Sequence, residues 1–175
     1  GGGQLGRMLA LAGTPLGQQF AFLDPAPDAC AQALGEHIRA DYSDTDHLRQ
    51  LAEEVDVVTF EFESVPAETV AFLSQFVPVY PNAESLRIAR DRWFEKSMFQ
   101  DLGIPTPEFA DIQSQDNLDA AVKRIGLPAV MKTRTLGYDG KGQKVLRHPD
   151  DVVDAFAELG SVPCILEGFV PFTGE

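Results

Sequence analysis

Apolar positions along the first half of the chain follow two different periods. In residues 4–12 (QLGRMLALA) they have the spacing that places them on one side of a helix, at Leu5, Met8, Leu9 and Ala12. Residues 55–62 (VDVVTFEF) instead form a β-branched run, typical of a strand buried on both faces. The same patterns predict strands at 19–23, 37–40 and 77–80, and helices at 43–54 and 66–76.

This alternation of strands and helices favours a parallel sheet with helices on its faces. The first segment is therefore predicted to be a Rossmann-like α/β domain. A turn rich in glycine opens the chain at Gly1, where such a fold would have just completed a strand. We expect at least that first strand of the sheet to lie outside the chain.

The pattern changes after residue 82. Two short helices are predicted at 83–88 and 91–102, ended by Gly103 and by Pro105 and Pro107. The pattern then predicts a strand at 108–111, a helix at 116–125, a strand at 129–132, a loop at 133–142, a strand at 143–146, a helix at 149–159 and a strand at 163–170. This order predicts a small antiparallel sheet backed by helices. We divide the chain into residues 1–82, a helical linker of residues 83–107, and an α+β lobe of residues 108–175.

Composition narrows the classes of function. The 175 residues are 44% hydrophobic and carry a net charge of −13, which makes the chain a poor general binder of nucleic acid. The two cysteines, Cys30 and Cys164, have no metal-binding spacing, and no apolar run reaches membrane-spanning length, so we expect no membrane partner and a cytoplasmic location. The chain does not start with Met, and we expect it to be an internal segment of a longer protein.

The most informative stretch is a glycine-rich loop between two predicted strands. Lys132 ends the first strand, and Gly137, Gly140 and Gly142 lie in the loop beside Lys141. Glycines let backbone amides approach phosphate oxygens, and lysines add compact positive charge. The loop is not a Walker A loop, since neither Ser nor Thr follows Lys141 and no helix is predicted there. It predicts a flap over a nucleoside triphosphate; a plain hairpin turn with incidental lysines remains the alternative.

A second glycine cluster opens the chain. Gly1, Gly3 and Gly6 fit G-x-G-x-x-G, and Asp24 ends the next predicted strand, as a ribose-binding acid would. The pattern suits an NAD-dependent oxidoreductase, but a helix that starts on glycines attracts any phosphate, including a ribose 5′-phosphate. A tight turn without a ligand also stays open.

Two further places carry candidate ligand contacts. Glu61 near the end of the run at 55–62 and Glu63 directly after it lie at the sheet edge where ligands bind in α/β folds, and alternation predicts that both point to one face. Solvated loop acids remain the alternative, above all for Glu63. The strand at 163–170 is interrupted at Glu167-Gly168, where main-chain groups can read an adenine edge, and Glu175 lies where it can accept ribose hydroxyls. An edge strand with one glutamate and no ligand remains the alternative.

Taken together, these segments resemble the ATP-grasp superfamily and, within it, the 5-(carboxyamino)imidazole ribonucleotide synthase family of purine biosynthesis. The resemblance covers essentially the whole chain. It rests on five segments in order, which are GGGQLGRML, TFEFESVP, DRWFEKSMFQDLGIPTP, GLPAVMKTRTLGYDGKGQ and ILEGFVPFTGE.

The resemblance implies a role for each matching position. The ATP phosphates would be bound by Arg92 and Lys132 and covered by Gly137, Tyr138, Asp139, Gly140, Lys141, Gly142 and Gln143. Adenine would be bound by Glu167, Gly168, Phe169 and Val170, and the ribose by Glu175. The aminoimidazole ribonucleotide would be contacted by Gln4, Leu5 and Glu61. The carboxylating centre would be faced by Tyr138, Asp139 and Lys141, the last of which stands where the family commonly has arginine.

The reaction implied by the resemblance is ATP-dependent carboxylation of aminoimidazole ribonucleotide with bicarbonate. The resemblance also implies a homodimer and a magnesium cofactor whose ligands lie beyond Glu175, in a C-terminal lobe that the chain lacks. None of the residues present is expected to bind metal. We therefore expect the chain by itself to be inactive.

Three alternatives remain open from the sequence. A formate-dependent glycinamide ribonucleotide transformylase would share the opening loop, although its flap lacks the Tyr138-Asp139 pair. An NAD-dependent oxidoreductase would leave Lys132 and the second loop unexplained. A non-catalytic nucleotide-sensing module is the third.

Overall fold

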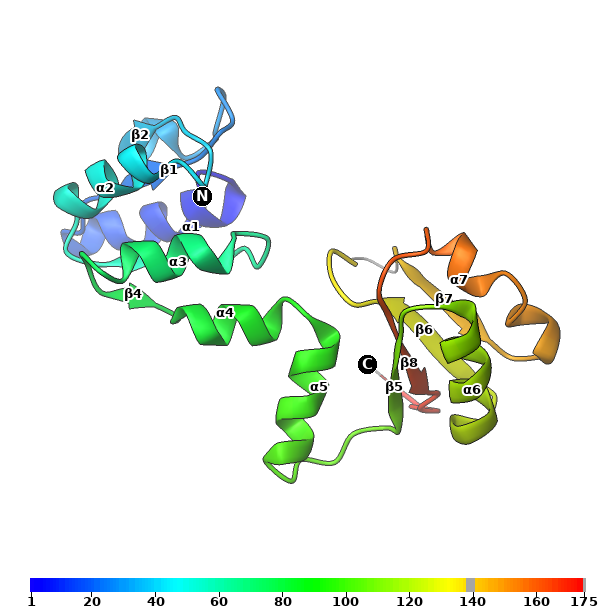
Figure 1. The fold of residues 1–175 in the computed structure, drawn as a ribbon. Coiled ribbons are helices and arrows are strands. Elements are labelled where there is room, and N and C mark those ends of the chain that lie inside the picture. The colour runs from blue at the N-terminus through cyan, green and yellow to red at the C-terminus, as the bar shows by residue number, and fades with distance from the viewer. Residues whose placement is uncertain (138–140, 175) are drawn as a thin grey trace. The chain divides into compact units, whose positions relative to one another are not determined.

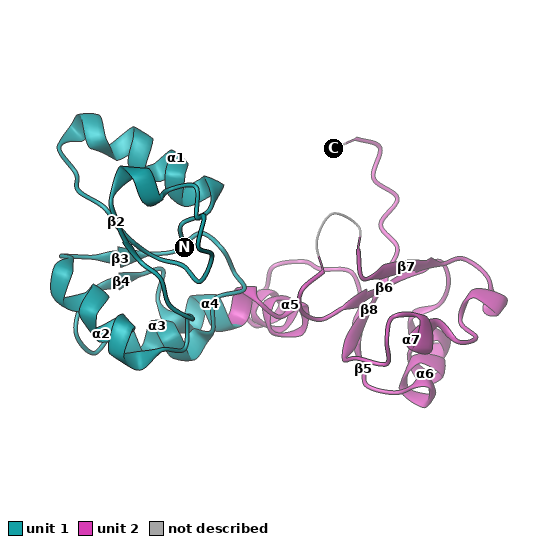
Figure 2. Cartoon of the chain, turned by 90° about the horizontal axis from the view of Figure 1, so that it is seen from above, with its two compact units in different colours: residues 1–87 teal, residues 88–175 magenta. Residues whose placement is uncertain are grey.

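The computed structural model describes residues 1–137 and 141–174. The chain divides into two compact units, residues 1–87 and 88–175, which are coloured separately in Figure 2. Helix α4 (Ala83–Ala89) crosses the boundary between them. Each unit has its own core and is described separately.

The first unit contains two parallel strand pairs with helices packed around them (Figure 1). Strand β1 (Ala21–Leu23) pairs with β2 (Glu36–Ile38), and β3 (Val58–Thr59) pairs with β4 (Val79–Tyr80). The helices of this unit are α1 (Gln4–Gly13), α2 (Thr45–Glu54) and α3 (Ala67–Leu73), with short 3₁₀ turns η1 (Thr14–Leu16) and η2 (Gln32–Leu34). The parallel pairing and the order of elements confirm the α/β prediction.

Local signals explain where these helices begin. The carboxylate of Asp44 accepts hydrogen bonds from the amides of Asp46 and His47, which caps the N-terminus of α2. Leu48 and Leu51 on its inner side are buried in a core that also includes Val70 and Leu73 of α3. The capping residue and the apolar spacing were both visible in the sequence.

The prediction for residues 55–62 was wrong in two respects. The strand is only β3 (Val58–Thr59), and it is not buried on both faces, since Val57 and Phe62 are about half exposed at 54% and 55%. Among the described residues β3 pairs only with β4, so its other edge has no neighbouring strand. A cavity of about 670 Å³ opens there, lined by residues of both strand pairs and by Leu9 of α1. The run has the composition of a central strand, but among the described residues it has one neighbouring strand.

The second unit is built on a four-stranded antiparallel sheet in the order β5-β8-β6-β7. Its strands are β5 (Phe109–Ile112), β6 (Ala129–Thr133), β7 (Gln143–Leu146) and β8 (Cys164–Gly168). Helix α6 (Gln115–Ile125) packs against the sheet, and α5 (Arg92–Asp101) precedes it in the chain. Ile112, Leu118 and Met131 are fully buried in this core. The predicted α+β lobe is confirmed.

One predicted helix of this unit is broken. Residues 149–159 form a 3₁₀ turn η3 (Pro149–Asp151) and a single helical turn α7 (Ala155–Glu158). Asp154 between them has φ +62, and a left-handed residue interrupts helical hydrogen bonding. The carboxylate of Asp151 accepts from the amides of Arg147 and His148, which closes the first turn tightly. Local side-chain hydrogen bonds therefore outcompete the apolar period here.

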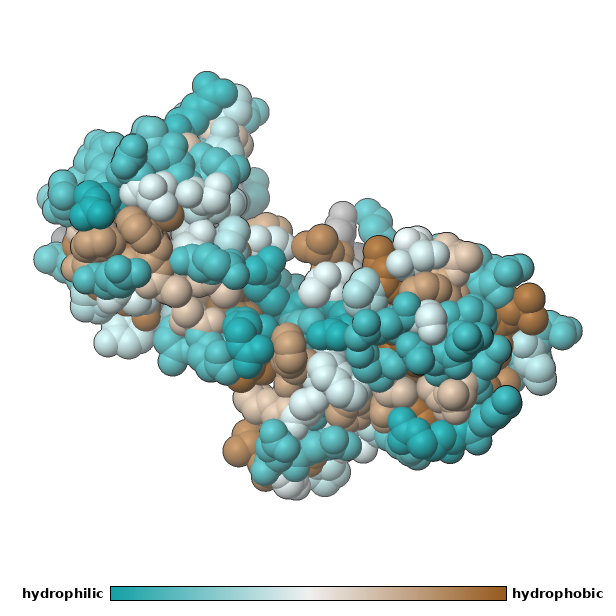
Figure 3. Space-filling view, viewed as in Figure 1, coloured by the Kyte–Doolittle hydropathy of each residue, from teal (hydrophilic) through white to brown (hydrophobic). Residues whose placement is uncertain are grey.

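Polar residues cover most of the face seen in Figure 3, with apolar patches between them. Within the described ranges, no helix is both long and apolar enough to cross a lipid bilayer.

Candidate functional site

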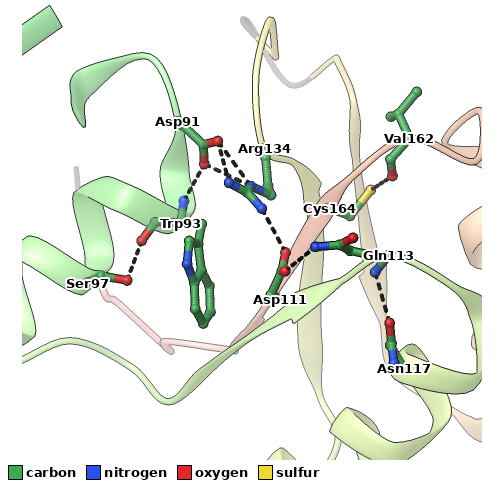
Figure 4. A network of polar contacts seen from close by, with 9 residues as sticks. All are labelled: Asp91, Trp93, Ser97, Asp111, Gln113, Asn117, Arg134, Val162 and Cys164. Carbon is green, nitrogen blue, oxygen red and sulfur yellow. Dashed lines mark hydrogen bonds and ion pairs between the residues drawn. The ribbon is translucent and has the colours of Figure 1, made fainter. Parts of the chain in front are cut away.

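Helix α5 is fixed to the sheet of the second unit by a partly buried ion network (Figure 4). Asp91, its N-cap, accepts from the amide of Trp93 at 2.9 Å. The guanidinium of Arg134, only 14% exposed, donates to both carboxylate oxygens of Asp91 and, at 3.1 Å, to Asp111 of β5. The hydrogen bonds to Asp91 raise the pKa of Arg134 above its ordinary value. The start of α5 is thus clamped to β5 and to the end of β6.

This clamp places Arg92 at the base of the glycine-rich loop. The Arg92 amide donates to the carbonyl of Arg134 at 3.0 Å. Its guanidinium donates to the carbonyl of Gly137 at 3.1 Å. The structure therefore brings together two predicted phosphate-binding positions that are far apart in the sequence.

Gly142 allows the two strands to come together at the base of the loop. The amide of Thr133 donates to the carbonyl of Gly142 at 2.8 Å, where the β6–β7 ladder pairs Lys132 with Gln143. Gly142 has φ +69, and a Cβ there would lie 2.7 Å from Oγ1 of Thr133. Only glycine suits this position. The prediction of a strand–loop–strand flap is confirmed for its two strands and for the base of the loop.

Several predicted site residues lie outside the described part of the chain. These are Tyr138, Asp139, Gly140 and Glu175. Lys141 is described and is exposed at the start of the turn that leads into β7.

Beside the loop, one buried carboxylate holds two lysines. Oε2 of Glu167 on β8 lies 3.1 Å from Nζ of Lys132 on β6 and 3.3 Å from Nζ of Lys96 on α5. The Glu167 side chain is 7% exposed. Lys132 and Glu167 were predicted to be site residues, but Lys96 was not. Its spacing of one helical turn from Arg92 was the available signal, since residues i and i+4 share a helix face.

The strand end at Glu167–Val170 differs from its prediction. The amides of Gly168 and Phe169 already donate to the carbonyls of Glu108 and Pro128, at 2.9 and 3.2 Å. They are therefore not available to read a base, because β8 lies between two neighbouring strands rather than at an edge. Val170 lies beyond the last residue of β8, and its side chain is about half exposed. Phe169 has the guanidinium of Arg147 over its ring.

In the first unit, Asp24 anchors the opening glycines. Its carboxylate accepts from the amides of Gly2 and Ala26, at 2.7 and 2.9 Å, and from the hydroxyl of Tyr42 at 3.2 Å. Burial tends to raise the pKa of Asp24, but these hydrogen bonds outweigh it and lower the pKa below its ordinary value. Burial also raises the pKa of Tyr42 to about 12, helped by the Asp24 charge. Asp24 therefore holds a turn, contrary to its interpretation as a ribose-binding acid.

Two of the glycines around the start of α1, Gly2 and Gly6, are required by close packing. A Cβ on Gly6 would lie 2.5 Å from the carbonyl oxygen of Gly1, and one on Gly2 would lie 2.9 Å from Cβ of Ala29. Gly3 is the N-cap and provides no side chain, so the first amides of α1 are not capped by one. Gln4 and Leu5 follow in the first turn, both exposed. This helix start has the character of an anion site.

Glu61, one of the two glutamates after β3, lies beside this turn. A Cβ on Gly1 would meet Oε1 of Glu61 at 3.9 Å, and the Glu61 charge contributes to the raised pKa of Tyr42. Glu63 lies in the following turn and is exposed. The strand on which the predicted alternation of Glu61 and Glu63 depended does not reach either residue, because β3 ends at Thr59.

A magnesium site does not fit the side chains at hand. Among residues 1–137 and 141–174, no group of three or more His, Cys, Asp or Glu side chains has an arrangement that could hold a metal ion. The cluster around Glu167 is cationic overall, which suits an anion rather than a divalent cation.

Comparison with known proteins agrees with this geometry. The family model of the ribonucleotide synthetase pre-ATP-grasp domain matches residues 1–90, and that of the ATP-grasp domain matches residues 97–175. The N5-carboxyaminoimidazole ribonucleotide synthase of Pseudomonas aeruginosa is 87% identical over all 175 residues, which cover 49% of its length.

Solved structures give the same result. A crystal structure of N5-carboxyaminoimidazole ribonucleotide synthetase from Thermus thermophilus is 47% identical with a TM-score of 0.89, over 99% of this chain and 46% of that one. The crystal structure of the Aspergillus clavatus N5-carboxyaminoimidazole synthase, in complex with ADP and 5-aminoimidazole ribonucleotide, is 26% identical with a TM-score of 0.86. The match covers 99% of this chain and 46% of that one. The chain thus spans about half the length of the relatives it matches.

The pre-ATP-grasp match to the first unit, the ATP-grasp match to the second, and the high identity over the whole chain agree with one another. The chain belongs to the ribonucleotide synthetase pre-ATP-grasp family through residues 1–90, its residues 97–175 match the ATP-grasp domain, and over its whole length it is similar to N5-carboxyaminoimidazole ribonucleotide synthases.

Proposed function

We propose that this chain is part of an enzyme that carboxylates 5-aminoimidazole ribonucleotide, using ATP and bicarbonate, to give 5-carboxyaminoimidazole ribonucleotide, ADP and phosphate. The observation that carries this proposal is the cationic site at the base of the glycine-rich loop, where Arg92 contacts Gly137 and Lys132 pairs with Gln143. The ADP and aminoimidazole ribonucleotide bound by the Aspergillus clavatus relative support the choice of ligands.

ATP would bind in the second unit. Arg92, Lys132 and Lys141 would neutralise the phosphates, and the loop from Gly137 through Gln143 would cover them. For adenine, the amide of Val170 is the best donor in the stretch from Glu167, because those of Gly168 and Phe169 are used within the sheet. Glu175 would accept the ribose hydroxyls.

Aminoimidazole ribonucleotide would bind in the first unit. Its 5′-phosphate suits the start of α1, where Gly3 offers no capping side chain and the helix dipole favours an anion. Gln4 and Leu5 would contact the ligand from the same turn. Glu61, held beside Gly1, would accept from its amine or hydroxyl groups.

The chemistry needs no nucleophile from the protein. An oxygen of bicarbonate attacks the γ-phosphorus of ATP, and the bond from that phosphorus to the β–γ bridging oxygen breaks, which gives carboxyphosphate and ADP. The exocyclic amine then attacks the carboxyl carbon, directly or after release of carbon dioxide; phosphate leaves and the amine loses a proton. Tyr138, Asp139 and Lys141 would face this centre and shield the mixed anhydride from water.

Magnesium would neutralise phosphate oxygens when bound, with ligands from a C-terminal lobe outside the described residues. The complete protein would act in the cytoplasm as a homodimer, which sedimentation of the full-length protein tests.

Phosphate release by the full-length protein, with each substrate omitted in turn, tests the function. We expect release to require ATP, bicarbonate and aminoimidazole ribonucleotide together. Release with formate and glycinamide ribonucleotide instead would overturn the proposal. The 175-residue chain alone is expected to release none, and robust ATP hydrolysis by it would contradict that expectation.

A further inference from the structure

The cluster of Lys96, Lys132 and Glu167 has two positive charges for one negative charge, so one lysine would be enough to neutralise the carboxylate. Both ammonium groups approach the same oxygen, Oε2 of Glu167, at 3.3 and 3.1 Å. All three side chains are largely buried, with exposed fractions of 18% for Lys96, 26% for Lys132 and 7% for Glu167. A buried carboxylate requires at least one cationic partner, because a buried negative charge without one is strongly destabilising. Here the second lysine is in excess.

Helix α5 presents this second lysine to the sheet. Arg92 and Lys96 are four residues apart and lie on one face of the helix. Arg92 reaches the loop carbonyl of Gly137, while Lys96 reaches Glu167. The clamp of Arg134 on the N-cap Asp91 fixes the helix that carries both cations.

If Lys132 is to neutralise ATP phosphates, it has to give up some or all of its contact with Glu167. With Lys132 as sole partner, each nucleotide that bound would leave the Glu167 carboxylate buried and unpaired. Lys96 removes that penalty, since it contacts the same oxygen from a different element. Freeing Lys132 then costs less, because the carboxylate that it leaves stays paired.

We propose that Lys96 is a positioning residue for nucleotide binding, which keeps Glu167 neutralised while Lys132 turns toward the phosphates. This inference rests on the proposed ATP site. It assigns Lys96 no contact with the nucleotide. Its effect passes through Glu167 to Lys132, and it therefore predicts energetic coupling among the three side chains.

The test measures ADP affinity of the full-length protein by titration calorimetry, without bicarbonate or aminoimidazole ribonucleotide. Lys96→Met is expected to weaken ADP binding about tenfold, within the usual range of coupling between sites. Lys96→Arg, which keeps the charge, is expected to restore most of the affinity. Lys123→Met, on the exposed surface of α6, is the matched control and should leave affinity unchanged.

A double-mutant cycle distinguishes positioning from a general structural role. In the Glu167→Gln background, Lys96→Met should change ADP affinity by less than about twofold, because no buried carboxylate then holds Lys132. An undiminished tenfold loss in that background would overturn the inference, as would wild-type affinity in Lys96→Met alone. Should Lys96→Met fail to fold, Lys96→Gln replaces it with the same two expectations.

These outcomes are separable from failure of the proposed function. If the wild-type protein binds ADP with this coupling but releases no phosphate with bicarbonate and aminoimidazole ribonucleotide, the carboxylation proposal fails and the role of Lys96 stands. If the wild-type protein does not bind ADP, both fail.

Discussion

At the scale of single residues, the first unit depends on the carboxylate of Asp24. It receives hydrogen bonds from two amides and from the hydroxyl of Tyr42, and these hold the glycine turn before α1. Because they stabilise the ionised form, the pKa of Asp24 is lowered in the folded protein. The stabilisation is therefore fully present above the unfolded pKa of about 3.9 and is lost as pH falls through the lower folded value.

Asp24→Asn is expected to lower the free energy of unfolding at pH 7 by about 1.5–3 kcal/mol, the usual contribution of hydrogen bonds to a charged group. The difference between variant and wild type should begin to shrink as pH falls below about 4, because Asp24 then takes up a proton in the unfolded chain before it does so in the folded protein. Urea unfolding at pH 7 and at pH 3 measures both values. An equal cost at the two pH values would contradict this account.

Residue by residue, the sequence indicated the cations of the loop but not their partners. Lys132 and the glycines stand out because of their order along the chain. Lys96 and Arg134 do not, because each is defined by a contact with a residue far away in the sequence, Glu167 and Asp91 respectively. Such contacts depend on how α5 packs against the sheet, which periodicity does not encode.

At the scale of elements, the glycine-rich loop is set by the geometry of its base. Gly142 combines φ +69 with crowding against Thr133, whereas Gly103 has φ +70 with no atom within 4 Å of its would-be Cβ. The two positions therefore share backbone strain and differ only in crowding.

Gly142→Ala is expected to lower the free energy of unfolding by about 2–4 kcal/mol and to raise the KM for ATP of the full-length protein, since Thr133 is pushed away. Gly103→Ala should cost only about 1 kcal/mol, for the left-handed conformation alone, and leave that KM unchanged. Chemical denaturation and steady-state kinetics of both variants measure these effects. The account fails at this point if the two alanines behave alike.

The clamp on α5 makes a second prediction at this scale. Arg134→Met leaves Asp91 and Asp111 without the guanidinium between them and should lower the free energy of unfolding by about 3 kcal/mol, the lower end of the range for buried pairs because these side chains are only partly buried. Glu84→Gln weakens the more exposed pair with Arg87 and should lower the free energy of unfolding much less. Thermal and urea unfolding compare the two, and a similar small cost for both would show that the clamp contributes little.

Most helices and strands could be predicted because capping residues and apolar periods agree locally, as at Asp44 of α2. Residues 149–159 could not, because the side chain of Asp151 competes for the backbone amides before it. The burial of β3 depends on a neighbouring strand, which no local pattern of residues 55–62 reveals.

At the scale of the whole molecule, the two units have separate cores. Leu48 and Val70 belong to the core of the first, and Ile112 and Leu118 to the core of the second. The sequence predicted this succession of an α/β and an α+β unit, because the strand and helix order changes after the short helices of residues 83–102. It did not predict two separate parallel pairs in the first unit.

Separate cores are expected to unfold separately. Ile112→Ala, at a fully buried position, should destabilise the second unit by about 2–5 kcal/mol and reduce amide protection in β5, β6 and β8. Protection of α2 and α3 in the first unit should stay unchanged. Hydrogen exchange followed by mass spectrometry tests this, and an equal loss of protection in both units would show a single cooperative unit instead.

The central claim is that the phosphates of a nucleotide lie at the base of the glycine-rich loop. A crystal structure of the full-length protein with ADP tests it most directly. We expect the diphosphate to contact Arg92 and Lys132 beneath the loop between β6 and β7, with Glu167 still paired to Lys96. A diphosphate bound instead at the glycines before α1, with the loop site vacant, would contradict the account.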